Sequence, residues 1–135
     1  MILVLVIDAN ILFSALIKDS LTAELIFNED FKLYSCDFII EEFFKYEPEI
    51  LKKTHRTREQ FITIIHQLKE IITIIPKEEY SHLLAEAEKF SPDPKDAIYF
   101  ALAMKLNGSI WSNDKKLKNQ SKVKVYQTHE ILQLV

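Results

Sequence analysis

The chain alternates between short apolar runs and longer segments with helical periodicity. Its first segment, Ile2 to Ile7, is continuously apolar and rich in β-branched residues, which is typical of a strand buried on both faces of a parallel sheet. Similar short runs predict further strands over 31–34, 71–75, 109–112 and 123–126. Apolar residues three and four positions apart predict helices over 9–16, 21–26, 37–47, 57–70, 78–90 and 93–106, with one turn at 114–117 and a short final helix.

Several polar residues are placed to begin or end these helices. Asp37 is expected to cap the third helix and Thr128 the last one, while Pro48 should kink or end the third. Strands separated by helices imply right-handed crossovers and a mostly parallel sheet between helix layers. The expected fold is therefore a three-layer α/β/α arrangement of the α/β class. No linker interrupts residues 1–135, so we expect a single domain.

Ligands of such sheets bind beyond the carboxyl ends of the strands, where crossovers diverge. Asp8 ends the first strand, with Asn10 two residues later, and Ser112 and Asp114 follow the fourth strand. Each has an ordinary structural explanation, because aspartate caps helices well and Ser, Asn and Asp residues commonly form turns. Their position after buried strands nevertheless makes them candidates for a ligand site.

Two more acidic segments lie in predicted helices. Asp93 can cap the helix that Pro94 opens, but capping does not explain Asp96, which the helix field would keep ionised and able to bind a cation. Glu41 and Glu42 flank an apolar helix face, where solvated glutamates are also common, and helical spacing leaves open which of them reaches a site.

Carboxylates gathered at one sheet edge would need a compensating charge. Two of them about 4 Å apart repel by roughly 4 kcal/mol at an effective dielectric near 20, so a cluster shifts its pKa values or recruits divalent cations. Ligand sets made only of oxygen favour Mg²⁺ or Mn²⁺ over zinc. Such metals suit phosphodiester hydrolysis.

Composition excludes several other classes of protein. Gly108 is the only glycine, so neither a P-loop nor a dinucleotide-binding loop can be built. Cys36 is the only cysteine, which excludes an internal disulfide and fits a packed residue in a reducing compartment. The run 2–7 is too short to span a membrane and lacks the features of a signal peptide, so we expect a cytoplasmic protein with no membrane partner.

Charge gives a mixed indication about nucleic acid. The net charge of −3 argues weakly against such a partner, unless several acids are gathered to hold cations. Basic residues at 52–58 form one stretch, and Lys115, Lys116 and Lys118 begin another directly after Asp114. A solvated face explains either stretch, and the second is the preferred candidate for contacts with an RNA backbone.

With these pieces in place, the chain resembles the PIN-domain nucleases, a family that includes VapC-like toxins. The matching segments are the apolar strand into Asp8-Ala9-Asn10, Ser35 through Glu41, Asp93-Pro94-Lys95-Asp96-Ala97, and Ser112-Asn113-Asp114. They occur in the family's order and span essentially the whole chain. Ser112 stands where many members have threonine, a departure that keeps the hydroxyl.

The resemblance implies a quartet of acids that bind Mg²⁺ or Mn²⁺ and support catalysis: Asp8, Glu41, Asp96 and Asp114. It implies an additional acid in Asp93, and it implies that Asn10 and Ser112 orient carboxylates or water. Glu41 is preferred to Glu42 because the family glutamate commonly falls six residues after the strand-end hydroxyl, here Ser35. A homodimer and a small antitoxin partner are also implied.

The leading hypothesis is therefore a metal-dependent endoribonuclease in which water attacks the phosphorus in line and no covalent enzyme intermediate forms. The toxin of a toxin–antitoxin pair is one role and RNA processing another, because a fold does not choose between them. One alternative is a phosphohydrolase with Asp8 as nucleophile, although Asn10 stands where that chemistry usually has a second acid. The other alternative is a non-catalytic RNA-binding or regulatory module.

Overall fold

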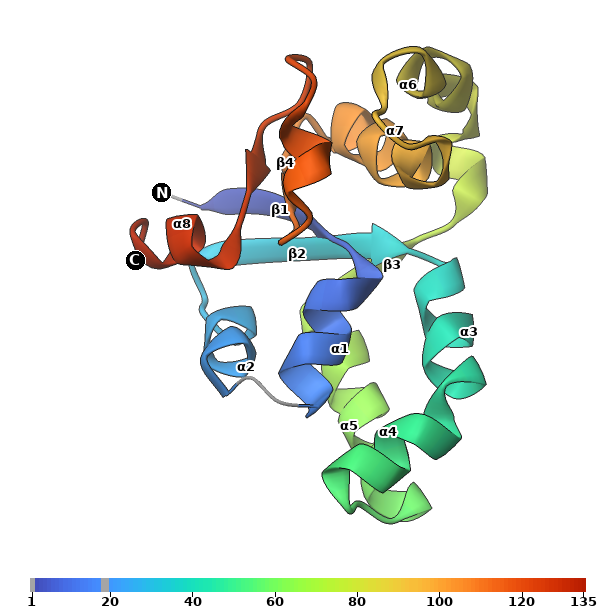
Figure 1. Ribbon diagram of the computed structural model, residues 1–135, viewed down its shortest axis with the longest axis vertical. Coiled ribbons are helices and arrows are strands. Elements are labelled where there is room, and N and C mark those ends of the chain that lie inside the picture. Colours follow the sequence, from blue (N-terminus) through green and yellow to red (C-terminus); the bar gives the residue numbers. More distant parts are fainter. Residues whose placement is uncertain (1, 18–19) are drawn as a thin grey trace.

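The computed structural model describes residues 2–17 and 20–135 and has a five-stranded sheet at its centre (Figure 1). All neighbouring strands in the described chain are parallel, in the order β3-β2-β1-β4-β5. This confirms the expected three-layer α/β/α class. The strands are β1 (Leu3–Ile7), β2 (Phe31–Cys36), β3 (Ile72–Ile75), β4 (Ser109–Trp111) and β5 (Val125–Tyr126).

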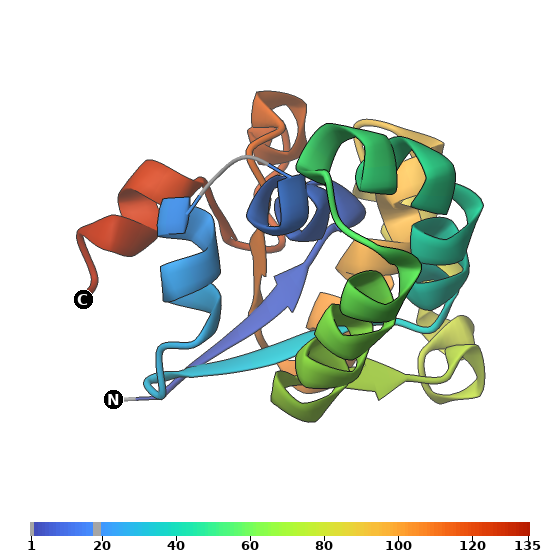
Figure 2. The same ribbon diagram turned by 90° about the horizontal axis from the view of Figure 1, so that it is seen from below.

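Helices cover both faces of the sheet (Figures 1 and 2). The α-helices are α1 (Ala9–Ile17), α2 (Ser20–Ile26), α3 (Phe38–Lys45), α4 (Glu47–Thr54), α5 (Arg58–Ile71), α6 (Leu84–Phe90), α7 (Ala97–Leu106) and α8 (Thr128–Leu132). Short 3₁₀ turns are η1 (Lys77–Glu79), η2 (Ser81–Leu83), η3 (Pro94–Asp96) and η4 (Lys115–Lys118). No helix in the described part of the chain is long and apolar enough to cross a membrane.

Burial on both faces accounts for the apolar sequence of β1. Leu5 and Ile7 face a core shared with α1 and α5, while Val6 faces a second core built mainly from α7. All three side chains are fully buried. Because successive side chains point to opposite faces of a strand, a strand covered on both sides must be apolar at every position.

Several helix starts carry the side-chain caps that Thr and Asp residues commonly supply. Thr57 and Gln60 form a reciprocal capping box at the start of α5. The Asp8 carboxylate accepts a hydrogen bond from the amide of Ile11, and Asp93 caps the turn that leads into α7. Pro48 stands near the start of a new helix after α3 has ended, as the sequence indicates.

Two of the predicted caps are wrong, and tertiary contacts explain both. Asp37 makes no capping bond; its carboxylate instead accepts a bond from the amide of Lys77 (3.4 Å). Gln127, not Thr128, caps α8, and the Thr128 hydroxyl accepts a bond from the Trp111 indole (3.1 Å). The predicted helix over 78–90 is also broken into 3₁₀ turns before α6, and the last strand is shorter than predicted.

The order of the strands creates a switch point next to β1. The chain goes from β1 to β2 and β3 on one side and then returns to β4 on the other side of β1. Crossovers therefore diverge between the carboxyl ends of β1 and β4, where the register pairs Ile7 with Trp111. Ligand sites in open α/β sheets lie at such a point.

Gly108 provides the close approach of α7 to β1 that this arrangement requires. A methyl group at this position would lie 2.7 Å from Val4 Cγ1 and 3.0 Å from the Val4 carbonyl oxygen. We predict that Gly108→Ala lowers the free energy of unfolding by about 1–3 kcal/mol, the usual range for overpacking. Urea denaturation would measure the change.

A double-mutant cycle provides the control for this prediction. Val4→Ala removes Cγ1 and should reduce the penalty of Gly108→Ala, leaving the contacts with the carbonyl oxygen (3.0 Å) and with Cβ (3.3 Å). An equal penalty in both backgrounds would show that the side chain of Val4 is not the constraint.

Candidate functional site

Asp8 lies at the switch point as the first residue after β1. Its amide donates to the Trp111 carbonyl, so the pairing of β1 with β4 continues up to the site. Its Oδ1 accepts a bond from the Ile11 amide (3.0 Å), and its Oδ2 accepts one from the Ser112 hydroxyl. The side chain is only 6% exposed. Asp8 is therefore both the cap of α1 and a buried, oriented carboxylate.

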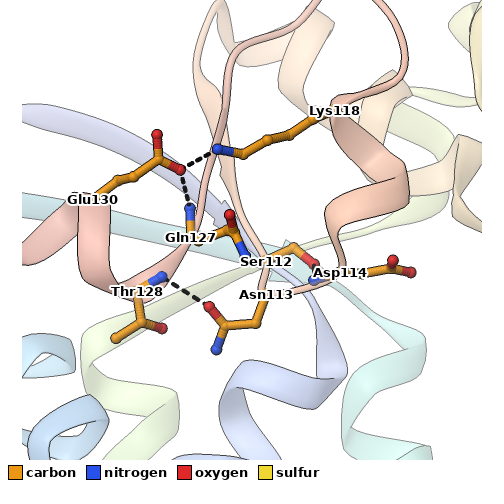
Figure 3. Close-up of polar contacts among 7 residues, drawn as sticks. All are labelled: Ser112, Asn113, Asp114, Lys118, Gln127, Thr128 and Glu130. Carbon is orange, nitrogen blue, oxygen red and sulfur yellow. Dashed lines mark hydrogen bonds and ion pairs between the residues drawn. The ribbon is translucent and has the colours of Figure 1, made fainter.

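The residues after β4 connect Asp8 to a second acid. Ser112 is fully buried, and its Oγ, which donates to Asp8, also accepts a bond from the amide of Asp114 (3.1 Å). Asp114 caps η4 by accepting a bond from the amide of Lys116 (3.0 Å). Figure 3 shows the Asp114 carboxylate pointing away from the Lys118–Glu130 ion pair. One hydroxyl thus fixes the relative positions of both acidic segments.

Asp93 and Asp96 come to the same edge from the start of α7. The Asp93 carboxylate accepts a bond from the amide of Lys95 (2.9 Å), which is the predicted cap. Asp96 is half-buried and makes no capping bond. Partial burial raises its pKa, the charges of Asp93 and then Asp114 raise it further, and Lys95 lowers it. The pKa of Asp96 is therefore raised by an acid of its own segment, Asp93, and by an acid of the segment after β4, Asp114.

The pKa of Asp8 shows the same mutual influence. Burial raises it to about 6 from an ordinary value of 3.8, and the charges of Asp96 and Asp114 act in the same direction. The bonds from Ser112 and Ile11 lower it but do not cancel the cost of burial. Three acids from separate segments thus interact electrostatically beside the β1–β4 switch point. Perturbed carboxylates in such a position are typical of functional sites.

This set of donors fits a divalent cation. Within residues 2–17 and 20–135, no group of three or more His, Cys, Asp and Glu side chains is already arranged as a metal site. The chemistry is nevertheless suitable, because carboxylate oxygens that repel one another are stabilised by Mg²⁺ or Mn²⁺. Asp96 is half-buried and Asp114 is exposed, so both have room to turn toward a cation, whereas Asp8 is held in place.

Glu41 and Glu42 have different surroundings on α3. Glu41 is exposed, while Glu42 is half-buried and lines a hollow together with Ala9 and Asn10 of α1. The family spacing favours Glu41, but the structure places Glu42 on the side of α3 that faces α1. Asn10 is exposed and lines the same hollow.

Two polar residues at this edge were not recognised from the sequence. The Tyr99 hydroxyl accepts a bond from the amide of Ala9 (3.2 Å), and burial followed by the charges of Asp8 and other nearby groups raises its pKa. Ser35, recognised only as a strand-end residue, donates to the carbonyl of Ile7 (2.8 Å) and ties the end of β2 to the end of β1. The position of Tyr99, three residues after Asp96, the N-cap of its helix, was the available signal.

The candidate RNA-binding lysines differ in their availability. Lys118 forms an ion pair with Glu130, which also accepts a bond from the amide of Gln127 (Figure 3). Lys115 and Lys116 are exposed on η4 directly after Asp114. These two side chains are better placed to meet a phosphate than Lys118, whose charge is already neutralised.

Comparisons with known proteins agree with this geometry. Residues 6–134 match a family model described as the PIN domain. Among solved structures, a chain of VapBC2 from Rickettsia felis, bound to a fragment of promoter DNA, matches this chain with a TM-score of 0.63 and 17% sequence identity. The match covers 93% of this chain and 98% of that chain. The curated proteins contain no match. Because the family model spans nearly the whole sequence, the chain belongs to the PIN-domain family of nucleases.

Proposed function

We propose that this protein is a divalent-metal-dependent endoribonuclease that uses Mg²⁺ or Mn²⁺. The single observation that carries the proposal is the buried Asp8 carboxylate, whose pKa is raised to about 6 beside Asp96 and Asp114 at the β1–β4 switch point. A scaffold that keeps mutually repelling acids together at this edge matches the needs of phosphodiester hydrolysis. The match to a family of nucleases supports the same chemistry.

In this proposal the chain's own residues hold and orient the charges. Asp8, Asp96, Asp114 and one glutamate of α3 would hold the cation, with Asp93 as an additional acid. When bound, the cation stabilises negative charge on the phosphodiester and lowers the pKa of water. Asp8 takes up a proton near pH 6 in the metal-free protein, so a cation competes with that proton at lower pH.

The geometry favours this role over that of a phosphohydrolase nucleophile. Both oxygens of Asp8 already accept hydrogen bonds, from Ile11 and from Ser112, and the side chain is buried. A covalent intermediate would require one oxygen to leave its partner and reach the phosphorus. The neutral Asn10 also supplies no second acid for that chemistry.

The biological setting is part of the same proposal. The similar Rickettsia felis structure is a VapBC2 complex bound to promoter DNA, which supports a toxin role with a small antitoxin partner for this chain. We further propose a cytoplasmic homodimer that acts on RNA, with Lys115 and Lys116 beside the RNA backbone. RNA processing without an antitoxin is the other role open to a nuclease of this family.

Cleavage of a labelled mixed-sequence RNA tests the function. We predict cuts with Mn²⁺ or Mg²⁺, none with EDTA, and loss of activity by at least about a hundredfold in Asp8→Asn, since even partners of metal ligands contribute roughly 10–100-fold. Asp30→Asn changes an exposed aspartate in a turn and should cut normally. Undiminished cutting by both Asp8→Asn and Asp96→Asn would exclude the assigned site, and RNA binding without cutting would favour the non-catalytic alternative.

The buried carboxylate also predicts how stability depends on pH in metal-free buffer. Because the folded pKa of Asp8 is raised from 3.8 to about 6, the folded state binds more protons than the unfolded state between these values. The free energy of unfolding should therefore fall as pH rises from about 4 to about 6, by up to about 3 kcal/mol. Asp8→Asn should lose most of this dependence in urea denaturation with EDTA, and a parallel profile for the variant would contradict the prediction.

Added Mn²⁺ gives a binding measurement that is independent of cleavage. A ligand that binds only the folded state raises the thermal midpoint, so Mn²⁺ should stabilise the wild type more at pH 7.5 than at pH 5 and should have little effect on Asp8→Asn.

The choice between the two glutamates of α3 needs a direct comparison. We predict that Glu42→Gln lowers kcat with Mn²⁺ by at least about tenfold, whereas Glu41→Gln changes it by less than about twofold, because Glu42 lines the hollow next to Asn10 and Glu41 is exposed. Each variant is the matched control for the other, since the residues are adjacent on one helix. The reverse order of effects would support Glu41, the assignment based on family spacing.

A further inference from the structure

A hollow beside α1 is lined mostly by residues that have no role in the proposed hydrolysis, with Glu42 as the exception. It has a volume of about 310 Å³ and lies between α1, α3 and α4, at the lower end of the range of roughly 300–1,000 Å³ for small-molecule pockets. Figure 2 shows these three helices together on one side of the sheet. A second hollow of about 470 Å³ continues along α1 and shares Asn10, Phe13, Ile17 and Lys53 with the first. Ala9 and Asn10, the first two residues after Asp8, line the first hollow, so it begins next to Asp8 along the chain.

The apolar wall of the hollow is aromatic and firmly supported. Phe13 and Tyr46 line it, with their ring centroids 5.8 Å apart and their planes perpendicular. Phe13 is held from behind by the buried Phe43, at 5.2 Å between centroids. Tyr46 remains 39% exposed, and the Lys45 ammonium lies 5.5 Å from the centroid of its ring, so a base that stacks here uses the other face of the ring or displaces this lysine. Exposed aromatic rings are the usual stacking partners of unpaired nucleobases.

The polar wall presents an acceptor next to a donor. Glu49 and Lys53 lie one turn apart on α4, with the ammonium 3.1 Å from Glu49 Oε1. Both side chains are more than half exposed, and such surface pairs contribute about 0–1 kcal/mol, so a ligand can recruit both groups at small cost. A carboxylate accepts two parallel hydrogen bonds from neighbouring N–H groups. The Watson–Crick edge of guanine offers two such groups, N1–H and N2–H, beside the O6 acceptor, whereas uracil offers one N–H between two acceptors.

We propose that this hollow is a nucleobase subsite that receives a guanine next to the phosphate cut by the enzyme. The guanine stacks against Tyr46, its N–H edge faces Glu49, and its O6 faces Lys53. The inference rests on the proposed ribonuclease function, because it gives that site a preferred substrate. It follows from the position of the hollow, which begins at the two residues after Asp8, and from the pairing of an aromatic wall with a polar wall that carries an acceptor and a donor.

Cleavage of four RNA octamers that differ only in one central nucleotide tests the proposal. With Mn²⁺ we expect kcat/KM for the guanine octamer to exceed that for the uracil octamer by about tenfold, the discrimination that one bidentate contact gives. Glu49→Gln should remove this preference, whereas Glu88→Gln, at an exposed position on α6, should keep it. Tyr46→Ala should lower kcat/KM by about tenfold, and Tyr46→Phe, which retains the ring, should not.

Photo-crosslinking separates this proposal from the nuclease function. The probe is the same octamer with 6-thioguanosine at the central position, which keeps both N–H groups, bound to the wild-type protein in EDTA. We expect crosslinks within 9–17 or 46–53. Crosslinks there without cleavage under any metal would overturn the nuclease proposal and keep the base subsite.

Two other results would overturn the subsite. The first is metal-dependent cleavage with equal rates for all four octamers and crosslinks outside these segments. The second is an unchanged cleavage pattern in Tyr46→Ala and Glu49→Gln, with both variants folded by circular dichroism. If, in that second case, a protein that co-purifies with the wild type were lost from both variants, the hollow would be assigned to a protein ligand instead.

Discussion

The molecule is organised around one carboxylate that is costly to bury. Asp8 lies between the carboxyl ends of β1 and β4 with 6% exposure, and its pKa of about 6 shows that two hydrogen bonds do not offset the loss of hydration. The Ser112 hydroxyl extends this constraint, since it donates to Asp8 and accepts from the backbone of Asp114. The site is therefore rigid where β1 and β4 meet and more open at Asp96 and Asp114. That combination suits a centre in which one fixed ligand is completed by others that adjust.

The parallel sheet makes this arrangement possible. A strand covered on both faces, such as β1, does not tolerate a charge among its buried residues, so an acid is placed at its end, where the start of α1 provides an amide donor. The buried strand 2–7 and the capping role of Asp8 both follow from local chemistry, and the structure confirms them. The cap of α7 at Asp93 was predictable for the same reason. Residues that both cap a helix and belong to the candidate site, such as Asp8 and Asp93, are therefore the ones that can be identified from a single sequence.

Contacts between distant segments explain what the sequence could not predict. Asp37 and Thr128 have the chemistry of caps, but Lys77 and Trp111, far away along the chain, bind their side chains instead. The position of Tyr99 beneath the start of α1 depends in the same way on how α7 packs. The choice between adjacent glutamates on α3 depends on the rotation of one helix against α1, which periodicity alone does not fix.

The charge distribution clarifies how an acidic protein with a net charge of −3 could act on RNA. Several basic side chains outside the site are bound to the protein itself: Lys53 to Glu49, Arg58 to Glu47, Lys118 to Glu130 and Arg56 to a carbonyl of α1. These four are exceptions among the basic residues, because exposed lysines such as Lys115 and Lys116 make no ion pair in the described chain and stay available to phosphates by counterion release. In the proposed function, a cation at the acidic edge and stacking in the adjacent hollow would add to this attraction. Because the net charge is negative, the affinity for RNA would then depend on the cleavage site as well as on the basic surface.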